Sequence, residues 1–362
     1  MLHQRKRPNT GNAVSVWESV EFDGHEQVCY FTDPASGLRT IVAIHSTALG
    51  PAAGGTRFMA YESDALALDD ALRLSRAMSY KSAIAGIPVG GGKSVIIGDP
   101  ARLKSVELLH AYGRFIDRIG HDYVTGQDVG FTTEDIDTMR DVTPYAGGTE
   151  GGGNGDSAIH TAKGIIYGLE AVLKCRFQTS SFDDVRLAIQ GLGGVGWRVA
   201  EALHARGAKL TVTDVRQELV GRAIDKLGAS YLPPAEIHSA DVDIFVPCAL
   251  GGVITDETAQ TIKARAVAGS ANNQLATPSA GEALAANDIL YAPDFVINAG
   301  GIISAMEEYY KMPGRVRFAE DPLETRLAQI KERLFDIFSR SAAEGLRPEV
   351  KAIKMAQELI GR

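Results

Sequence analysis

The 362-residue chain contains only three cysteines, two tryptophans and no long apolar run. Cys29, Cys175 and Cys248 are odd in number and form no C-x-x-C pair, which argues against a disulfide framework or a zinc knuckle. No apolar stretch approaches the ~18 residues of a membrane span, and none follows the basic N-terminus as a secretory signal would require. We therefore expect a cytoplasmic protein whose N-terminal tail is solvated.

Basic residues are also fewer than acidic ones: the chain has 37 lysines and arginines but 45 aspartates and glutamates, which gives a formal charge of −8. Such a surface repels phosphate backbones and anionic lipid, so neither nucleic acid nor a membrane is an expected partner. The eight histidines show no zinc-binding spacing, and we expect no metal site. Gly90–Ser94 resembles the end of a P-loop, but the first glycine of that motif would fall at Ile87.

Glycine is abundant, with 39 residues that gather in clusters, and the chain length predicts two domains. The glycine-rich segment Gly147–Asp156 is the best boundary. Before it, strand-like and helical patterns mix; after it, strands and helices alternate regularly, which predicts a parallel doubly wound sheet. The predicted fold is thus α/β, with a first domain over 1–147, joined by C-terminal helices over 332–362, and a Rossmann-type domain over 148–331.

The hydrophobic patterns also predict individual elements. In the first domain these are a hairpin of strands at Val28–Phe31 and Leu38–Ile44, a helix over 64–80, a glycine loop at 90–92, a strand over 94–97 and a helix over 103–119. In the second they are a helix over 158–175, strands over 185–189, 210–213, 242–246, 266–268 and 289–291, and terminal helices.

One glycine cluster, Gly191–Gly196, reads G-L-G-G-V-G and lies between an apolar strand and a helical pattern. In that context the G-x-G-x-x-G spacing predicts a dinucleotide site: the glycines permit a tight turn, close approach of a pyrophosphate and tight helix–strand packing. Asp214 ends the next strand, where a carboxylate binds the ribose 2′-hydroxyl and repels a 2′-phosphate. NAD is therefore favoured over NADP, although the nearby Arg216 leaves NADP open. A turn without ligand is the simpler alternative.

Two lysines and an aspartate are candidates for the chemistry. Lys81 and Lys93 are flanked by small or apolar residues, as is Asp128. A desolvated lysine has a lowered pKa and can act as a base near neutral pH. By spacing alone, ordinary surface lysines are the more frequent explanation.

Several further segments follow one another in a fixed order over residues 40 to 305. They are Gly50–Arg57, Met78–Lys93, Ser94–Asp99, Thr125–Val129, Gly191–Gly196, Pro247–Gly252, Gly269–Leu275 and Tyr291–Gly301. Together they resemble the amino-acid dehydrogenase family that includes leucine, valine, phenylalanine and glutamate dehydrogenases. The resemblance implies a substrate-binding and oligomerisation domain, an NAD-binding domain and an active site in the cleft between them.

The resemblance also implies roles for single residues. Lys93 is similar to the general base that activates water, Asp128 to the group that exchanges a proton with the amino nitrogen, and Lys81 to the lysine that pairs with the substrate carboxylate. Gly54 and Gly55 resemble the backbone that borders the substrate. The implied cofactor-binding residues are Gly191, Gly193, Gly194, Val195, Gly196, Asp214, Thr161, Ala249, Asn272, Asn273 and Asn298.

The substrate side chain is less well defined. Ala53 and Gly126 are smaller than the residues of leucine-type relatives and enlarge the expected pocket, whereas neighbouring segments resemble the valine and leucine branch. Met78, Ile302 and Ala305 would also border this pocket, and no added cation is present to pair with a glutamate side chain. The resemblance thus implies reversible NAD-dependent deamination of leucine, valine, isoleucine or phenylalanine by a homo-oligomer. A dehydrogenase for another amino acid and a catalytically silent NAD-binding protein are the alternatives.

Overall fold

The computed structural model describes residues 15–148, 157–311 and 322–362, and the expected N-terminal tail and most of the Gly147–Asp156 segment lie outside them. Contacts divide the chain into two compact units. The first unit comprises residues 1–47, 52–76 and 91–146, and the second comprises 48–51, 77–90 and 147–362. The C-terminal helices, which we expected to join the first domain, are grouped with the second unit.

The first unit contains a five-stranded sheet in the order β1-β2-β4-β3-β5. Its strands are β1 (Gln27–Asp33), β2 (Leu38–Ser46), β3 (Ala52–Met59), β4 (Gly90–Ile97) and β5 (Tyr123–Gly126). The expected hairpin of β1 and β2 is confirmed, β2 and β4 are also antiparallel, and β3 and β5 are parallel.

The expected glycine loop at 90–92 is wrong, because these residues form the start of β4. Glycine is required at position 92 for packing, since a Cβ there would lie 2.6 Å from the ring of Tyr123 on β5. The pattern was misleading because a run of glycines ordinarily interrupts a strand.

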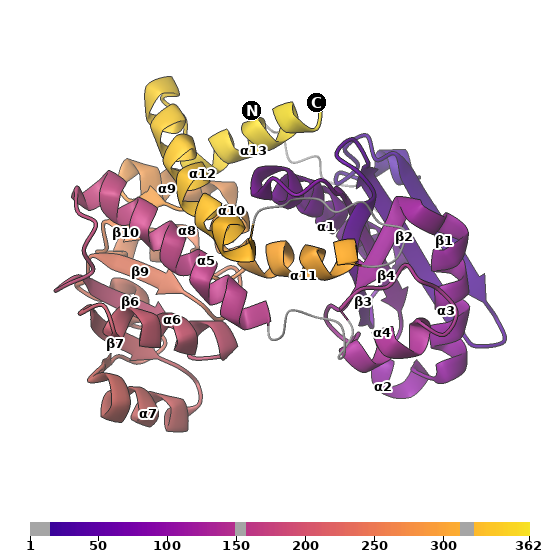
Figure 1. Ribbon diagram of the computed structural model, residues 1–362, viewed down its shortest axis with the longest axis horizontal. Coiled ribbons are helices and arrows are strands. Elements are labelled where there is room, and N and C mark those ends of the chain that lie inside the picture. The colour runs from indigo at the N-terminus through magenta and orange to yellow at the C-terminus, as the bar shows by residue number, and fades with distance from the viewer. Residues whose placement is uncertain (1–14, 149–156, 312–321) are drawn as a thin grey trace. The chain divides into compact units, whose positions relative to one another are not determined.

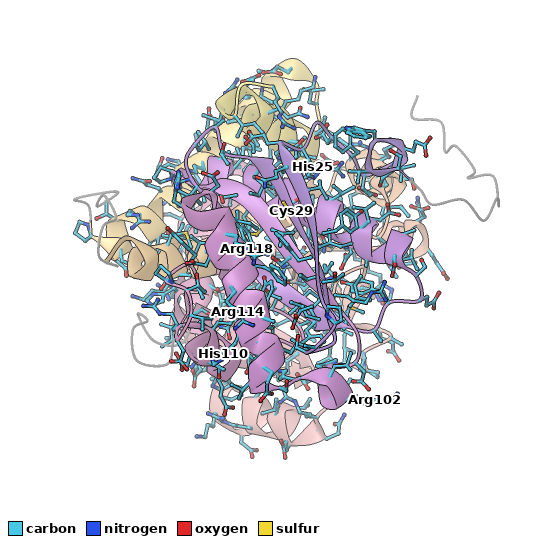
Figure 2. All side chains as sticks on the ribbon, turned by 90° about the vertical axis from the view of Figure 1, so that its right-hand side faces the viewer. His25, Cys29, Arg102, His110, Arg114 and Arg118 are labelled. Carbon is cyan, nitrogen blue, oxygen red and sulfur yellow. The ribbon has the colours of Figure 1, made fainter. Side chains whose placement is uncertain are left out.

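Helices cover both faces of this sheet (Figure 1). On one face Leu68 and Leu72 of α1 (Asp64–Ala85) pack against Ile41 and Val95. The other face packs against α3 (Val106–Ile119) and α4 (Thr133–Met139), and the short α2 spans Pro100–Leu103. Figure 2 shows the outer face of α3, where His110, Arg114 and Arg118 follow one another at four-residue spacing.

The second unit contains a six-stranded sheet in which every neighbouring pair is parallel. The strands are β6 (Arg186–Gln190), β7 (Lys209–Thr213), β8 (Ser230–Tyr231), β9 (Ile244–Pro247), β10 (Ala266–Val267) and β11 (Leu290–Tyr291), in the order β11-β10-β9-β6-β7-β8. Read from the other edge this is the 3-2-1-4-5-6 order of the doubly wound dinucleotide fold, whose switch point lies between β6 and β9. The predicted fold class is confirmed.

The helices of this unit are α5 (Ser157–Val172), α6 (Gly194–His204), α7 (Gln217–Leu227), α8 (Asp256–Thr261), α9 (Pro278–Ala286), α10 (Asp294–Ile297), α11 (Gly300–Lys311), α12 (Leu323–Glu344) and α13 (Pro348–Leu359). Helix α5 passes close to its neighbours because it carries Gly164 and Gly168, where a Cβ would lie within 3 Å of Ile330 and Ile297. None of the helices in the described ranges combines the length and apolar character that a membrane crossing requires.

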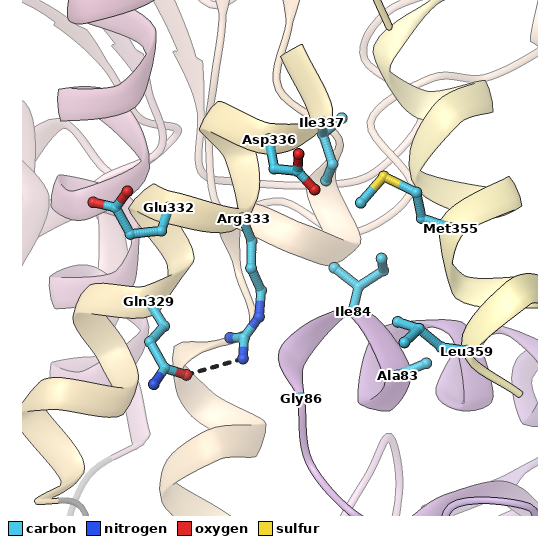
Figure 3. A pocket seen from close by; sticks show the side chains of 10 residues that line it. All are labelled: Ala83, Ile84, Gly86, Gln329, Glu332, Arg333, Asp336, Ile337, Met355 and Leu359. Carbon is cyan, nitrogen blue, oxygen red and sulfur yellow. Dashed lines mark hydrogen bonds between the residues drawn. The ribbon is translucent and has the colours of Figure 1, made fainter. Parts of the chain in front are cut away.

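The end of α1 packs against α12 within the second unit, beside a pocket of about 450 Å³ (Figure 3). Gly86 has a φ of +63°, and a Cβ there would lie 2.2 Å from Nη2 of Arg333. Arg333 donates a hydrogen bond to Gln329 over 3.0 Å, and burial together with Arg326 lowers its pKa to about 10. This contact is one of those that join residues 77–90 to the C-terminal helices in the second unit.

A buried hydroxyl network stabilises the first sheet and yields a test. Tyr123 donates to the carbonyl of Gly54 over 2.6 Å and accepts from Ser94 over 3.0 Å. Tyr123→Phe should lower the free energy of unfolding by ~1–3 kcal/mol, because it leaves both partners unsatisfied. Tyr30→Phe, at a ring 54% exposed on β1, is the matched control and should change little in urea denaturation. Equal effects of the two substitutions would contradict this role of the Tyr123 hydroxyl.

Candidate active site

The first unit contains a buried ion pair between Lys93 and Asp128. Lys93 lies on β4 with 6% of its surface exposed, and its ammonium donates to Oδ2 of Asp128. Burial lowers the pKa of Lys93 below its ordinary value, although Asp128 opposes this shift. Burial raises the pKa of Asp128, but Lys93 and the Val129 amide outweigh it and hold that pKa below its ordinary value. The sequence-predicted catalytic pair is thus in direct contact.

A tight turn positions Asp128 directly after β5. The Phe131 amide donates to the carbonyl of Asp128 over 2.9 Å, and the Phe58 amide of β3 donates to the carbonyl of Val129 over 2.8 Å. Gly130 has a φ of +72°, and a Cβ there would lie 1.9 Å from the carbonyl oxygen of Phe58. Only glycine therefore allows this turn to lie against β3.

Arg57 on β3 is a second cation beside this pair, and the sequence did not single it out. Its Nη1 donates to Asp70 over 2.9 Å, and its Nη2 lies 3.7 Å from Oδ2 of Asp128. Asp70 also accepts from the hydroxyl of Tyr61 over 2.9 Å. The positive charge of Arg57 contributes to lowering the pKa of Lys93. In the sequence, Arg57 stands out only as the last residue of Gly50–Arg57, one of the segments that resemble the dehydrogenase family.

The small residues expected to border the substrate lie on the paired strands β3 and β5. Gly54 pairs with Thr125 and Gly55 with Gly126, whereas Ala53 is opposite Val124. Ala53 and Gly54 are buried, while Gly55 and Gly126 are half-buried. A Cβ at Gly55 would lie 2.3 Å from the carbonyl oxygen of Gln127, so that position admits no side chain.

Lys81 belongs to the second unit, where it joins two of the predicted cofactor residues. Its Nζ donates to Oδ1 of Asn298 over 2.7 Å, and Nδ2 of Asn298 donates to Oδ1 of Asn272 over 2.8 Å. Asp294, which the sequence did not single out, lies beside this chain of polar groups. Burial raises its pKa, while the charge of Lys81 acts in the opposite direction.

The remaining predicted residues of the second unit are more scattered. Thr161 on α5 donates to the carbonyl of Ser157 over 2.9 Å, and a Cβ at Gly301 would lie 2.8 Å from its Oγ1. Asn273 has a φ of +51°, and its carbonyl accepts from the Gly252 amide. Met78 and Ile302 are half-buried and Ala305 is exposed; these apolar side chains lie outside the dinucleotide pocket described below.

The Gly191–Gly196 segment connects β6 to α6, as predicted. Gly191 has a φ of +98°, and a Cβ at Gly196 would lie 2.0 Å from the Gly191 carbonyl oxygen, so the helix and strand approach closely. The side of Gly193 is open, since the nearest atom to a Cβ there is Nη2 of Arg216 at 4.0 Å. Gly194, Val195 and Gly196 form the first turn of α6, whose amides are available to an anion.

Asp214 follows β7 and is only 8% exposed. A pocket of about 480 Å³ joins it to Gly191, Gly193 and Ala249, four residues that the sequence predicted to bind a cofactor. Val215 and Leu250 also line this pocket and are 85% and 79% exposed. Large exposed apolar side chains beside an open glycine backbone fit the adenosine part of a dinucleotide. The missing side chains of Gly193 and Gly196 thus fit the cofactor that the motif implies.

Among the described residues, no group of three or more histidine, cysteine or acidic side chains is placed to hold a metal ion.

Comparison with known proteins identifies the family. Residues 25–145 match the family model for the Glu/Leu/Phe/Val dehydrogenase dimerisation domain, and residues 211–359 match that for glutamate/leucine/phenylalanine/valine dehydrogenase. Leucine dehydrogenase of Geobacillus stearothermophilus is 41% identical over 96% of this chain and 94% of its own. Phenylalanine dehydrogenase of Bacillus thermotolerans is 43% identical over 97% of this chain and 94% of its own.

Among solved structures, L-tryptophan dehydrogenase from Nostoc punctiforme aligns with a TM-score of 0.85 and 38% identity, over 96% of this chain and 99% of that one. The matches cover nearly the whole chain and agree with its two-domain α/β fold. The chain therefore belongs to the glutamate/leucine/phenylalanine/valine dehydrogenase family and is an amino-acid dehydrogenase.

Proposed function

We propose that this protein catalyses the reversible NAD-dependent oxidative deamination of a hydrophobic L-amino acid to the 2-oxo acid, ammonia and NADH. The observation that carries the proposal is the buried Lys93, whose pKa lies below its ordinary value and whose ammonium contacts Asp128. A lysine of this kind can take a proton from water, which an exposed lysine at neutral pH cannot.

The chain's own residues then have distinct tasks. Lys81 binds the substrate carboxylate. When bound, the nicotinamide supplies the two-electron oxidation that turns the amine into an iminium. Lys93 removes a proton from the water that attacks the iminium carbon, and Asp128 exchanges a proton with the nitrogen, which leaves as ammonia. The Arg57 charge favours the neutral form of Lys93 and the ionised form of Asp128.

For the cofactor we propose NAD. The open backbone of Gly193 and the first turn of α6 would receive the pyrophosphate, and Asp214 would face the adenosine ribose. Val215 and Leu250 would border the adenine ring. Thr161, Asn272, Asn273 and Asn298 would serve the nicotinamide side.

A hydrophobic substrate is supported by the names of the relatives, which are leucine, phenylalanine, valine and tryptophan dehydrogenases. Ala53 and Gly126 bring almost no side chain to their strands, which favours a bulky substrate. Met78, Ile302 and Ala305 add apolar surface. Because one methylene changes discrimination by only ~1–3 kcal/mol, several substrates should be accepted.

We also propose a homo-oligomer assembled through the first domain, because residues 25–145 match a model described as a dimerisation domain. In this scheme residues 1–147 bind substrate and partner copies, and residues 148–331 bind NAD.

The first test is NADH formation by the purified protein with NAD and single L-amino acids: alanine, valine, leucine, phenylalanine, tryptophan and glutamate. We expect kcat/KM to be highest for one or more of the large hydrophobic members and lowest for glutamate, because Ala53, Met78 and Ile302, which should border the substrate side chain, offer no charge to a second carboxylate. Turnover of glutamate above all others, or of none despite measurable NAD binding, would contradict the proposal.

Lys93→Met tests the assigned base. We expect kcat to fall between about 100-fold and 10,000-fold, because the proton acceptor is lost, while NAD binding measured by calorimetry stays within about twofold. Lys104→Met is the matched control, since Lys104 also pairs with an aspartate, Asp135, over 2.6 Å in the same unit. Normal turnover by the Lys93 variant would exclude this residue as the base.

The pH profile tests the electrostatics. A basic lysine acts when neutral, so kcat/KM should rise as pH increases through the lowered pKa of Lys93. Arg57→Gln removes a charge that disfavours the ammonium form; the pKa of Lys93 should increase, and the rising limb should move to higher pH. Arg73→Gln removes the other arginine paired with Asp70, at 2.7 Å, and should leave the limb in place. A limb that stays or moves downward in the Arg57 variant would refute this assignment.

A further inference from the structure

A second hollow lies next to the dinucleotide pocket and has an unusual concentration of positive charge. It measures about 460 Å³ and is lined by Arg198, Arg216 and Arg222, with Glu201 as its one acidic residue among those that line it. Gly193 and Arg216 line both this hollow and the dinucleotide pocket, so the two adjoin at the glycine turn. On a chain with a formal charge of −8, three arginines at one site indicate an anionic ligand.

Each arginine is held in place by a specific contact. Arg222 stacks over the ring of Trp197, with 3.9 Å between its Cζ and the ring centroid. Arg198 donates to the Gly194 carbonyl over 2.6 Å, and the Nε of Arg216 donates to Asp214 over 3.3 Å. A cation–π contact and hydrogen bonds reduce the freedom that these side chains would lose on binding a ligand.

Two of the guanidinium groups, those of Arg198 and Arg216, also lie near the glycine turn. Nη2 of Arg216 lies 4.0 Å from the position of a Cβ at Gly193, and Nη1 of Arg198 lies 3.7 Å from that at Gly194. The 11-residue helix α6 begins at Gly194, so its amides add positive potential at the same place. A phosphate beside this turn would meet both arginines and the helix terminus.

Asp214 is the residue that should repel such a phosphate, but its charge is already engaged. Its Oδ2 accepts from the Leu192 amide over 2.7 Å, and its Oδ1 accepts both from the Arg216 amide over 2.9 Å and from the Arg216 side chain. Burial raises the pKa of Asp214, but these donors outweigh it and keep the carboxyl ionised. The carboxylate is thus balanced by Arg216 rather than facing the hollow alone.

We propose that this arginine hollow, formed by Arg198, Arg216 and Arg222, is a subsite for the 2′-phosphate of NADP. The chain then accepts NADP as well as NAD, with the extra phosphate bound by the arginines while the adenosine occupies the adjoining pocket. We favour a ribose-linked phosphate over free phosphate because the hollow shares Gly193 and Arg216 with the dinucleotide pocket. This inference rests on the dinucleotide pocket of the proposed function.

The test compares adenosine 5′-monophosphate with adenosine 2′,5′-bisphosphate, which differ only by the 2′-phosphate, in calorimetric titrations of the full-length protein. We expect the bisphosphate to bind tighter by on the order of tenfold, as hydrogen bonds to charged groups provide. Its advantage should shrink as salt increases, because salt screens exposed charges. Inorganic phosphate, titrated alone, should bind far more weakly than the bisphosphate.

Variants locate the effect. Arg216→Gln and Arg222→Gln should each remove most of the advantage of the bisphosphate, measured as the ratio of the two Kd values. Arg206→Gln is the control, because Arg206 follows the opposite end of α6 and lines a different pocket. The ratio of kcat/KM for NADP and NAD should fall in the two hollow variants and stay constant in the control.

The outcomes separate this inference from the proposed function. Binding of the monophosphate with no advantage for the bisphosphate would overturn the inference and leave the dinucleotide pocket standing. If inorganic phosphate binds as tightly as the bisphosphate, the hollow is a free-phosphate site, and the inference is overturned as well. If neither nucleotide binds, the dinucleotide pocket itself is wrong, and the inference falls with it.

Discussion

The proposed chemistry depends on holding the ammonium of Lys93 away from water. Burial of an unpaired charge costs several kcal/mol, so Lys93 needs a carboxylate at hydrogen-bond distance, and Asp128 supplies it. The position of Asp128 in turn depends on the parallel pairing of β3 and β5 and on the Gly130 turn against Phe58. The sheet of the first unit can therefore be understood as the support for one ion pair, with Arg57 and Asp70 adjusting its charge balance.

Several glycines are needed because a side chain at their positions would collide with the backbone. At Gly55, Gly130 and Gly196 a single added carbon would lie within 2.3 Å of a backbone oxygen. In the first unit this allows the residues on either side of Asp128 to approach β3. In the second unit it brings α6 close to β6, so that its amides lie at the switch point of the sheet. In both units glycines thus let main-chain segments approach one another closely, which fits the high glycine content of the chain.

Much of this was accessible from the sequence, because it depends on local patterns. Alternation predicted the β1–β2 hairpin, and the G-x-G-x-x-G spacing with its flanking strand and helix predicted the β6–α6 turn. Contacts between distant segments were not accessible: Gly92 of β4 is explained by its packing against the Tyr123 ring on β5. The strand β8 was not predicted either, because it has only two residues and both are exposed. Arg57 and Asp294 were missed for the same reason, since only tertiary packing brings them to Asp128 and Lys81.

The glycine contacts have a consequence for mutational tolerance. A saturation scan scored by turnover should find Gly130 and Gly196 intolerant, because every larger residue there must displace a backbone oxygen, and the proposed role of Lys93 makes that position intolerant as well. Such a scan would therefore not separate positions required for folding from a position proposed to act in the chemistry. A parallel measurement of protein abundance would separate them, since substitutions at the glycines deplete the folded protein, whereas removal of a buried ammonium leaves a carboxylate that can take up a proton.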